Sequence, residues 1–457
     1  MTSNRGDDRL SAMLAAGISR RQVLRSGAIA AAGLSSMGLL AACGSDDDSS
    51  ASGSGSSTTG SGSAELSFVY MGTAEQQKSW NDLFAEFGRT SRDITLKATG
   101  VPVDNWAAFF DKVNTQIAGG VKYDIVQIAT EGRELFAAAN LLEPLDAFIG
   151  RDRRELDELL ADVDPNLIKW NTESGSPDGR TYYLPGDFNT MCLWLNTDVV
   201  KRAGADIPTD EWTWDDFYAL GRQVKDRTGA FLYPATAEYF IGVMPWLTTN
   251  GASTMSADWR TATCDTPEAI EAAEFARKLV QDRLSPAPGG SFDRFTLTIQ
   301  GRMAAFGGGR WPILQVRSLR AVDKFELFAW PHNKARRGSP VGWAGYPIFK
   351  TSENKDAAWT FVKFLVSEQG ETYFARGGGT IVPARRSVAE SPAFLDNSPR
   401  GSEKLYEALS YATPIPSPPR NNIIQREIED IWGQILTGNT SAEDGMKKMQ
   451  DEITANL

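Results

Sequence analysis

Hydrophobic positions along this chain change their spacing in a regular order, from continuous runs to helical spacing and back. The run 66–71 (LSFVYM) is apolar and rich in strand-forming residues, so it predicts a buried strand. Segment 75–89 follows at helical spacing, with one apolar face made by Trp80, Leu83, Phe84 and Phe87. A second strand is predicted at 94–101. The next helix has an apolar face made by Trp106, Phe109, Phe110 and Val113.

The alternation continues through the rest of the chain. A third strand at 123–129 and a helix from Arg133 complete a strand–helix series with short connections. Such a series favours a parallel sheet with helices on both faces. Later helices are predicted from Thr213 and Pro267 and at 352–375, 421–438 and 441–454, and later strands at 325–331 and 343–350. The fold class is therefore α/β, and the chain is too long for one sheet.

The first 42 residues follow a different pattern. Arg20 and Arg21 stand together, and a weakly apolar segment rich in Ala, Gly and Ser runs from 28 to 42. A basic region, a short apolar region and small residues before a cut point are typical of an export signal, and the paired arginines indicate the twin-arginine type. An uncleaved anchor helix is the alternative, but the segment is short for a membrane span, which needs about 20 strongly apolar residues.

The sequence Leu40-Ala41-Ala42-Cys43 resembles a bacterial lipobox. That resemblance implies cleavage before Cys43 and a lipid on its sulfur. Residues 44–63 hold no large apolar side chain, so they predict a flexible tether. At about 5–6 Å × √n, twenty residues span roughly 25 Å. We therefore expect an exported protein, anchored by lipid to the outer face of the cytoplasmic membrane, with a folded body above it.

Charge and composition exclude some classes of function. The first 42 residues hold five of the 47 basic and two of the 58 acidic side chains, so 42 basic and 56 acidic ones remain, a formal charge of −14. An acidic body argues against nucleic-acid binding. Cys192 and Cys264 are the only other cysteines. They are either a disulfide or two separate buried thiols, and the sequence does not decide between these.

Catalytic motifs are missing from the chain. His332 is the one histidine, and no GxSxG, CxxC, HExxH, Walker A or GxGxxG motif accompanies it. Carboxylate pairs suited to glycoside hydrolysis remain open because acidic residues occur throughout. We predict a binding protein without cofactor or metal, rather than an enzyme.

Four motifs occur in order along the body: YYLPGDFNTMCLWLNTDVVKRAG, WTWDDFYALGRQV, FGGGRWP, and the stretch from GYPIFK to ARRSV. Together they resemble the extracellular solute-binding proteins of bacterial ABC importers, and among them the carbohydrate-binding cluster that includes the maltose-binding proteins. The resemblance covers nearly all of 65–457. It implies two α/β lobes, each a doubly wound sheet, joined by a three-crossing hinge near 187–189, 330–333 and 380–384. Lobe one would comprise 65–187 and 331–381; lobe two would comprise 188–330 and 382–457.

The resemblance also implies a mechanism and partners. A monomer would close its lobes around a sugar or oligosaccharide and deliver it to an ABC permease. Ligand that contacts both lobes favours the closed form. A glycerophosphodiester or other anionic solute is the alternative ligand, motivated by two arginines. A surface glycosidase or carbohydrate adhesin is the alternative of another class.

Candidate ligand contacts combine aromatic faces for sugar rings with polar groups for hydroxyls. Trp311 follows three glycines that let backbone approach a ligand, and its alternative is a core position. Glu75, Thr130 and Glu131 follow strand ends at the edge where ligands collect, although Glu75 could serve only its helix. The resemblance, motif by motif, adds Arg310, Trp343, Tyr346, Asp187 or Asn189, Tyr239, Trp246 and Arg385. For Arg310 and Arg385 the alternative is an ordinary surface role.

Overall fold

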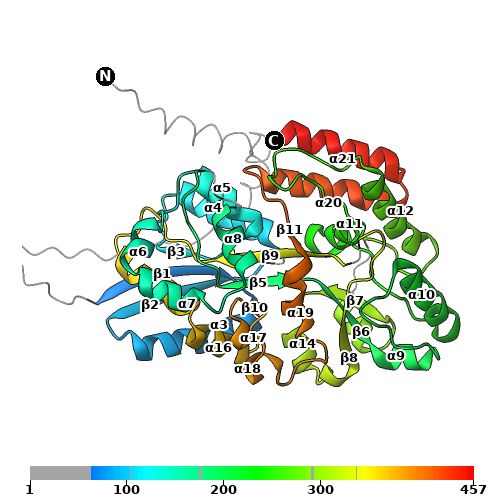
Figure 1. Ribbon diagram of the computed structural model, residues 1–457, viewed down its shortest axis with the longest axis horizontal. Helices are drawn as coiled ribbons and strands as arrows, with labels where there is room; N and C mark the ends of the chain where they lie inside the picture. Colours follow the sequence, from blue (N-terminus) through cyan, green and yellow to red (C-terminus); the bar gives the residue numbers. More distant parts are fainter. Residues whose placement is uncertain (1–62, 104, 174–175, 177, 290–292, 336) are drawn as a thin grey trace, which may run out of the picture. The chain divides into compact units, whose positions relative to one another are not determined.

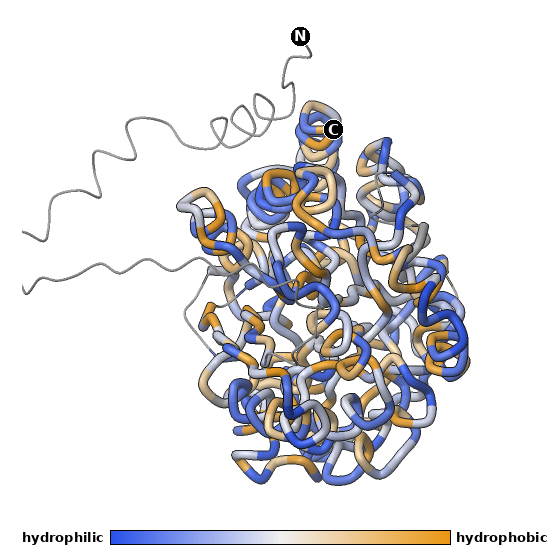
Figure 2. Tube along the Cα trace, turned by 90° about the vertical axis from the view of Figure 1, so that its left-hand side faces the viewer, coloured by the Kyte–Doolittle hydropathy of each residue, from blue (hydrophilic) through white to orange (hydrophobic). Residues whose placement is uncertain are grey.

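The computed structural model describes residues 63–457, except 104, 174–175, 177, 290–292 and 336. The predicted signal, Cys43 and the tether up to Gly62 lie outside the described residues, so these predictions stay predictions. Within the described part, no helix is both long and apolar enough to cross a membrane. Figure 2 shows hydrophobic and hydrophilic residues mixed along the described trace, without a long uninterrupted hydrophobic segment.

The predicted parallel sheet of the first lobe is confirmed. β1 lies between β2 and β3, parallel to both. Side chains alternate along β1, so that Phe68 belongs to the hydrophobic cluster of α3 and α15, and Val69 belongs to the cluster of α4 and α5. The elements are β1 (Ala64–Met71), α3 (Ala74–Thr90), β2 (Ile94–Val101), α4 (Trp106–Ala118), β3 (Ile125–Val126), β4 (Ile128–Ala129), η1 (Thr130–Gly132), α5 (Arg133–Ala138), α6 (Asp146–Arg151), α7 (Arg153–Leu160) and α8 (Pro165–Glu173).

The third predicted strand is divided into β3 and β4 at Gln127. Its backbone N–H donates to Val69 O at 2.8 Å, and its side-chain oxygen accepts from the backbone of Met71 at 3.2 Å. β3 therefore continues the β1 sheet, while β4 leaves it and pairs with β9 (Ser339–Gly345). The division carries the chain out of the lobe-one sheet just before Thr130 and Glu131.

The second lobe is built around β6, which pairs antiparallel with β7 and with β8. The parallel pairing found in the first lobe is thus not repeated here. This part contains β5 (Asp187–Thr190), β6 (Cys192–Asn196), α9 (Thr197–Arg202), α10 (Trp214–Thr228), η2 (Tyr239–Val243), α11 (Met244–Thr249), α12 (Pro267–Gln281), α13 (Arg294–Ile299), β7 (Ala305–Gly308), α14 (Ile313–Ser318), η3 (Val322–Lys324) and β8 (Phe325–Ala329). Cys192 and Cys264 are free thiols, both buried.

A third sheet collects strands from distant parts of the sequence around β9. β5 and β4 pair antiparallel with β9, β11 pairs parallel with it, and β10 pairs with β5 (Figure 1). β5 and β10 coincide with two of the predicted crossings; the exact lobe boundaries stay a prediction. The remaining elements are α15 (Lys355–Leu365), α16 (Glu368–Arg376), β10 (Val382–Pro383), α17 (Arg386–Ala389), α18 (Pro392–Leu395), α19 (Lys404–Glu407), η4 (Ala408–Tyr411), β11 (Ala412–Pro414), α20 (Asn421–Thr437) and α21 (Ala442–Asn456).

The single long helix predicted at 352–375 is wrong. The chain forms α15 and α16 instead, separated at Ser367, whose side chain caps α16 by accepting from Gly370 N. A serine placed before a Glu-rich turn is a strong helix start, and here it overrides the continuous helical spacing. By contrast, the predicted capping box of Thr213 and Asp216 is confirmed.

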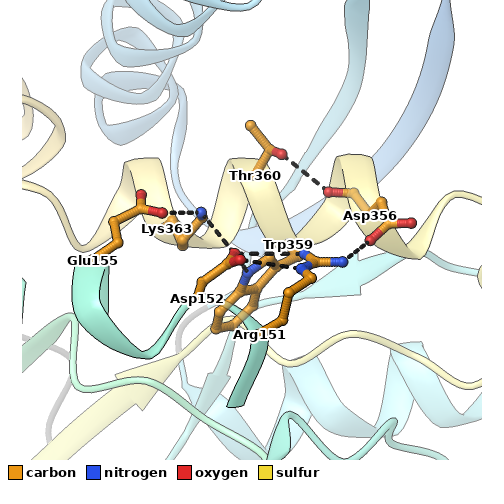
Figure 3. Close-up of polar contacts among 7 residues, drawn as sticks. All are labelled: Arg151, Asp152, Glu155, Asp356, Trp359, Thr360 and Lys363. Carbon is orange, nitrogen blue, oxygen red and sulfur yellow. Dashed lines mark hydrogen bonds and ion pairs between the residues drawn. The ribbon is translucent and has the colours of Figure 1, made fainter. Parts of the chain in front are cut away.

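A charged cluster joins α6 and α7 to α15 (Figure 3). Asp152 accepts hydrogen bonds from the indole of Trp359 at 2.7 Å and from Lys363 at 2.9 Å, and Arg151 Nε lies 3.1 Å from it. The Trp359 side chain is buried, so its N–H depends on this carboxylate. Hydrogen bonds from Arg151, Lys363 and Trp359 hold the pKa of Asp152 well below its usual range.

Replacement of Asp152 by alanine should destabilise the protein by about 1–3 kcal/mol at pH 7, because the indole N–H of Trp359 loses its acceptor. A lowered native pKa gives stability above the unfolded value of about 3.9 that is lost as the pH falls. The difference in the free energy of unfolding between D152A and the unsubstituted protein should therefore become smaller as the pH falls from 5 to 3. Chemical denaturation measures both effects, and D157A, in an exposed ion pair on α7, is the control expected within about 0.5 kcal/mol.

Candidate functional site

Several predicted ligand contacts meet around the pairing of β5 with β9. Asn189 lies directly opposite Gly342 in this ladder. The Asn189 side-chain oxygen accepts from Arg310 N at 2.7 Å, just before Trp311. The half-buried Trp311 ring lies 6.1 Å from the ring of Phe240. The structure thus brings Asn189, Trp311 and β9 together, as the sequence analysis expected of a shared site.

Gly342 marks the point where three other segments converge. A β-carbon at this position would lie 3.6 Å from each of Thr130, Phe240 and Ile415. These residues come from η1, from η2 and from the segment after β11. The surface over Gly342 is therefore bounded by both predicted lobes, which is the arrangement expected of a ligand cleft.

The glycines before Trp311 were expected to let the backbone approach a ligand, but in the structure protein side chains occupy the space beside them. A β-carbon at Gly307 would lie 2.6 Å from the Trp330 ring, and one at Gly309 would lie 2.4 Å from the Asn189 side chain. Both positions therefore need glycine because protein groups approach the backbone closely. Their presence places Asn189 against the turn that carries Trp311.

Trp343 lies on the other face of the ladder. It is opposite Phe188 in register, one residue from the Asn189–Gly342 pair, so the pleat directs its side chain away from Gly342. Its ring stacks on Trp170, with centroids 5.9 Å apart, and the Arg133 guanidinium lies 5.2 Å from it. Trp343 contributes its backbone to this region, because its N–H donates to Thr130 Oγ1 at 2.7 Å.

Glu131 lies next to Thr130 and faces the helix α20 of the second lobe. The side-chain amide of Asn421, at the start of α20, donates to Glu131 O at 3.2 Å. Burial raises the pKa of Glu131 to about 7, and the negative charge of Glu429 on the same helix adds to this. Glu429 itself accepts from Tyr239 N at 3.0 Å and from Gln425 at 2.9 Å.

Three of the predicted residues, Asp187, Tyr346 and Arg385, lie in a separate internal cluster. The Asp187 carboxylate accepts from the hydroxyl of Tyr346 and from Ala344 N at 3.2 Å. Burial raises the pKa of Asp187 to about 7. Glu371, a buried neighbour that the sequence analysis did not select, accepts from Arg385 N at 3.0 Å, and the Arg385 guanidinium reaches Leu159 O and lies 3.5 Å from Asp162.

Arg310 and the remaining predicted residues also have internal surroundings. Arg310 is fully buried, donates to Phe394 O at 2.9 Å, and lies 4.3 Å over the Phe394 ring. The hydroxyls of Tyr239 and Thr254 share a hydrogen bond of 2.7 Å. Trp246 is buried among the aromatic rings of the second lobe. Glu75 falls in the first turn of α3, and its side chain lies outside the described residues.

Sequence reasoning missed Phe240, Asn421 and Glu429. Phe240 stands next to Tyr239, which the resemblance to the family selected instead. Asn421 and Glu429 lie on a helix whose apolar spacing looked like an ordinary core helix. A polar residue at a helix start is the one signal that pointed to Asn421, and it is a weak one.

Replacement of Asp187 by asparagine should change how stability depends on pH. Because the native pKa of Asp187 is raised above the unfolded value of about 3.9, its ionisation weakens the fold as the pH rises toward 7. The asparagine variant lacks this loss, so its stability relative to the unsubstituted protein should increase by up to about 1.4 kcal/mol per pH unit within that range. Denaturation between pH 4.5 and 8 checks this. Parallel curves of stability against pH for the two proteins would contradict this prediction. D82N, at an exposed position, is the control.

The sequence is similar to one known protein family and to several named binding proteins. The family described as bacterial extracellular solute-binding protein matches residues 72–372. A Brucella abortus protein named only as a binding protein is 24% identical over 359 residues, 74% of this chain and 80% of that one. The arabinooligosaccharide-binding protein of Halalkalibacterium halodurans is 23% identical over 314 residues, 61% of this chain and 66% of that one.

Solved structures agree on the fold. The ABC substrate-binding protein of Listeria monocytogenes in complex with cycloalternan is 22% identical, with a TM-score of 0.75 over 86% of this chain and 98% of that chain. The predicted two-lobed fold is thereby confirmed. Since the family match spans more than half of the sequence, this protein belongs to the bacterial extracellular solute-binding proteins.

Proposed function

We propose that this protein captures a sugar, an oligosaccharide or a similar polyhydroxylated solute between its lobes. The observation that carries the proposal is the convergence on Gly342 of Thr130, Phe240 and Ile415, with Trp311 beside Phe240. Aromatic rings suit the CH faces of a sugar, and the carboxylate of Glu131, next to Thr130, is a polar group suited to its hydroxyls. The ligands named for two relatives, arabinooligosaccharides and cycloalternan, support the same class.

Closure of the lobes is the mechanism that we propose. The hydrogen bond from Asn421 to Glu131 O joins α20 to η1, and Glu134 and Arg260 attract one another nearby. Contacts of this kind form only when the two predicted lobes are close together. A ligand that bridges the same surfaces favours the closed form, which a permease of the ABC type would then unload.

An anionic ligand is the less favoured alternative. Arg310 and Arg385 motivated it, but both guanidinium groups have partners inside the protein, and Arg310 is fully buried. A phosphodiester beside Glu131 would also meet a carboxylate, and like charges repel. Glycoside hydrolysis is also less favoured, because the relatives above are named as binding proteins.

The proposal includes an anchored location. The predicted signal, a lipid on Cys43 and the linker 44–63 would hold the folded body at the outer face of the cytoplasmic membrane. Tethering keeps the loaded protein within reach of its permease without any additional contact. The body is expected to act as a monomer and as a carrier that returns its ligand unchanged.

Ligand binding is tested by thermal shift of the purified full-length protein in detergent, against neutral oligosaccharides, polyols and glycerophosphodiesters. A ligand at a hundredfold excess over its dissociation constant should add about 2.7 kcal/mol of stability. We expect the shift from a neutral solute and its loss in W311A, because the exposed part of the ring is removed. W212F, whose ring packs in the core of the second lobe, should lower the melting point but keep the shift. An unchanged shift in W311A, or a shift from phosphodiesters alone, would count against the proposal.

Anchoring is tested separately by replacing Cys43 with serine. The variant has no sulfur to carry a lipid, so the protein should move from the membrane fraction to the soluble fraction of the exported material. The buried thiol variant C264S is the control and should stay with the membrane. Membrane retention of C43S would indicate an uncleaved anchor helix instead.

A further inference from the structure

The side chain of Asn189 joins three separate parts of the chain. Asn189 stands on β5 opposite Gly342, so its side chain lies on the face of the ladder that borders the proposed site. Its oxygen accepts from Arg310 N at 2.7 Å, and its amide nitrogen donates to Thr380 O at 3.3 Å. Both polar atoms therefore have protein partners, which fix the orientation of the amide. The side chain that the sequence indicated as a ligand contact holds protein backbone instead.

The first of these partners belongs to the turn that carries Trp311. A β-carbon at Gly309 would lie 2.4 Å from the Asn189 side-chain oxygen and 2.6 Å from the Trp311 ring. The oxygen and the ring are therefore close neighbours. The indole of Trp194 donates to Gly309 O at 3.1 Å and holds the turn from the core of the second lobe. Asn189 holds the same turn from β5, which coincides with one of the predicted crossings.

The second partner belongs to a glycine-rich segment, 377–380, that enters another predicted crossing. The hydroxyl of the buried Ser79, on α3 of the predicted first lobe, donates to Gly377 O at 2.6 Å. Gly378 has a φ of +89°, which favours glycine, and a β-carbon there would lie 2.6 Å from Leu314 on α14. The segment thus lies between α3 and α14, the helix that follows the turn.

The segment contacts α14 directly as well as through Asn189. The direct contact, between Gly378 and Leu314, is apolar and has no preferred direction. The contact through Asn189 is directional, because one planar amide group bonds to the segment and to the turn of Trp311 at once. A displacement of the segment is therefore passed to the turn mainly through Asn189.

From these contacts we propose that Asn189 is a positioning residue, which sets the place of the Trp311 ring in the cleft and makes that place depend on the segment 377–380. Because Ser79 attaches the segment to α3, closure of the lobes would move the two together, and Asn189 would bring the ring to its stacking position in the same step. The inference rests on the proposed function, since it assigns Asn189 a role in the same cleft. That role acts through Trp311 and not through direct contact with the solute.

Fluorine NMR of the full-length protein in detergent tests the inference without any solute. The protein is labelled with 5-fluorotryptophan, and the resonance of Trp311 is assigned by its absence from W311F. In S79A the segment 377–380 loses its hydrogen bond to α3, so the Trp311 resonance should shift or broaden. T90A removes a hydroxyl bond of 3.0 Å to Phe87 O at the other end of the same helix and should leave the resonance in place.

Two variants of Asn189 separate its two hydrogen bonds. N189D keeps an acceptor for the turn but has no donor for the glycine-rich segment, so the Trp311 resonance should stay near its place and no longer respond to S79A. N189A loses both bonds, so the resonance should shift or broaden without any other substitution. N354A, which loses an amide bond of 3.1 Å to Glu65 O in lobe one, is the control and should leave the resonance unchanged.

A response to S79A that persists in N189D would mean that the coupling runs through another contact, and it would overturn the inference. An unchanged Trp311 resonance in S79A, or in N189A, would overturn it as well. If one of the two Asn189 variants does not fold, the response to S79A in the other still decides, because it should be absent from both. If the coupling is found and no solute stabilises the protein, the proposed function fails while the positioning of Trp311 by Asn189 stands.

Discussion

The backbone pairing of β9 is the constraint on which the rest of the site depends. β9 takes β5, β4 and β11 as partners, so three distant segments of the chain are fixed to one strand. The hydroxyl of Thr130 strengthens this attachment, because it both accepts from and donates to the backbone of Trp343. Once these partners are in place, Asn189, Thr130 and Ile415 surround Gly342 without further adjustment.

Basic and acidic side chains near the proposed site have different surroundings. The arginines closest to the hinge strands are turned inward, toward carbonyl oxygens, aromatic rings and a carboxylate. The acidic side chains Glu131 and Glu429 have no ion pair with Lys or Arg among the described residues, and burial raises the pKa of both. A motif that contains arginine therefore says little about ligand charge until the direction of its side chain is known. Here the inward direction of Arg310 and Arg385 removes the reason to expect an anionic ligand.

The sequence predicted the helices, strands and caps that depend on the spacing of neighbouring residues. It did not predict side-chain positions that depend on the register between paired strands. The strand at 94–101, the capping box at Thr213 and the helices near the C-terminus all follow from neighbouring residues, and they were found. Trp343 was expected to share the cleft with Trp311, yet a shift of one residue in the ladder turns it to the opposite face. The partners of Glu131 come from residues almost 300 positions away, and spacing carries no information about them.

Gly342 has a consequence for the evolution of this site. A β-carbon there would meet Thr130, Phe240 and Ile415 at 3.6 Å, which is ordinary van der Waals contact. A methyl group would fit without displacing any strand, and it would occupy volume that a ligand could otherwise fill. The size of the proposed binding site can therefore be adjusted at a single position of β9.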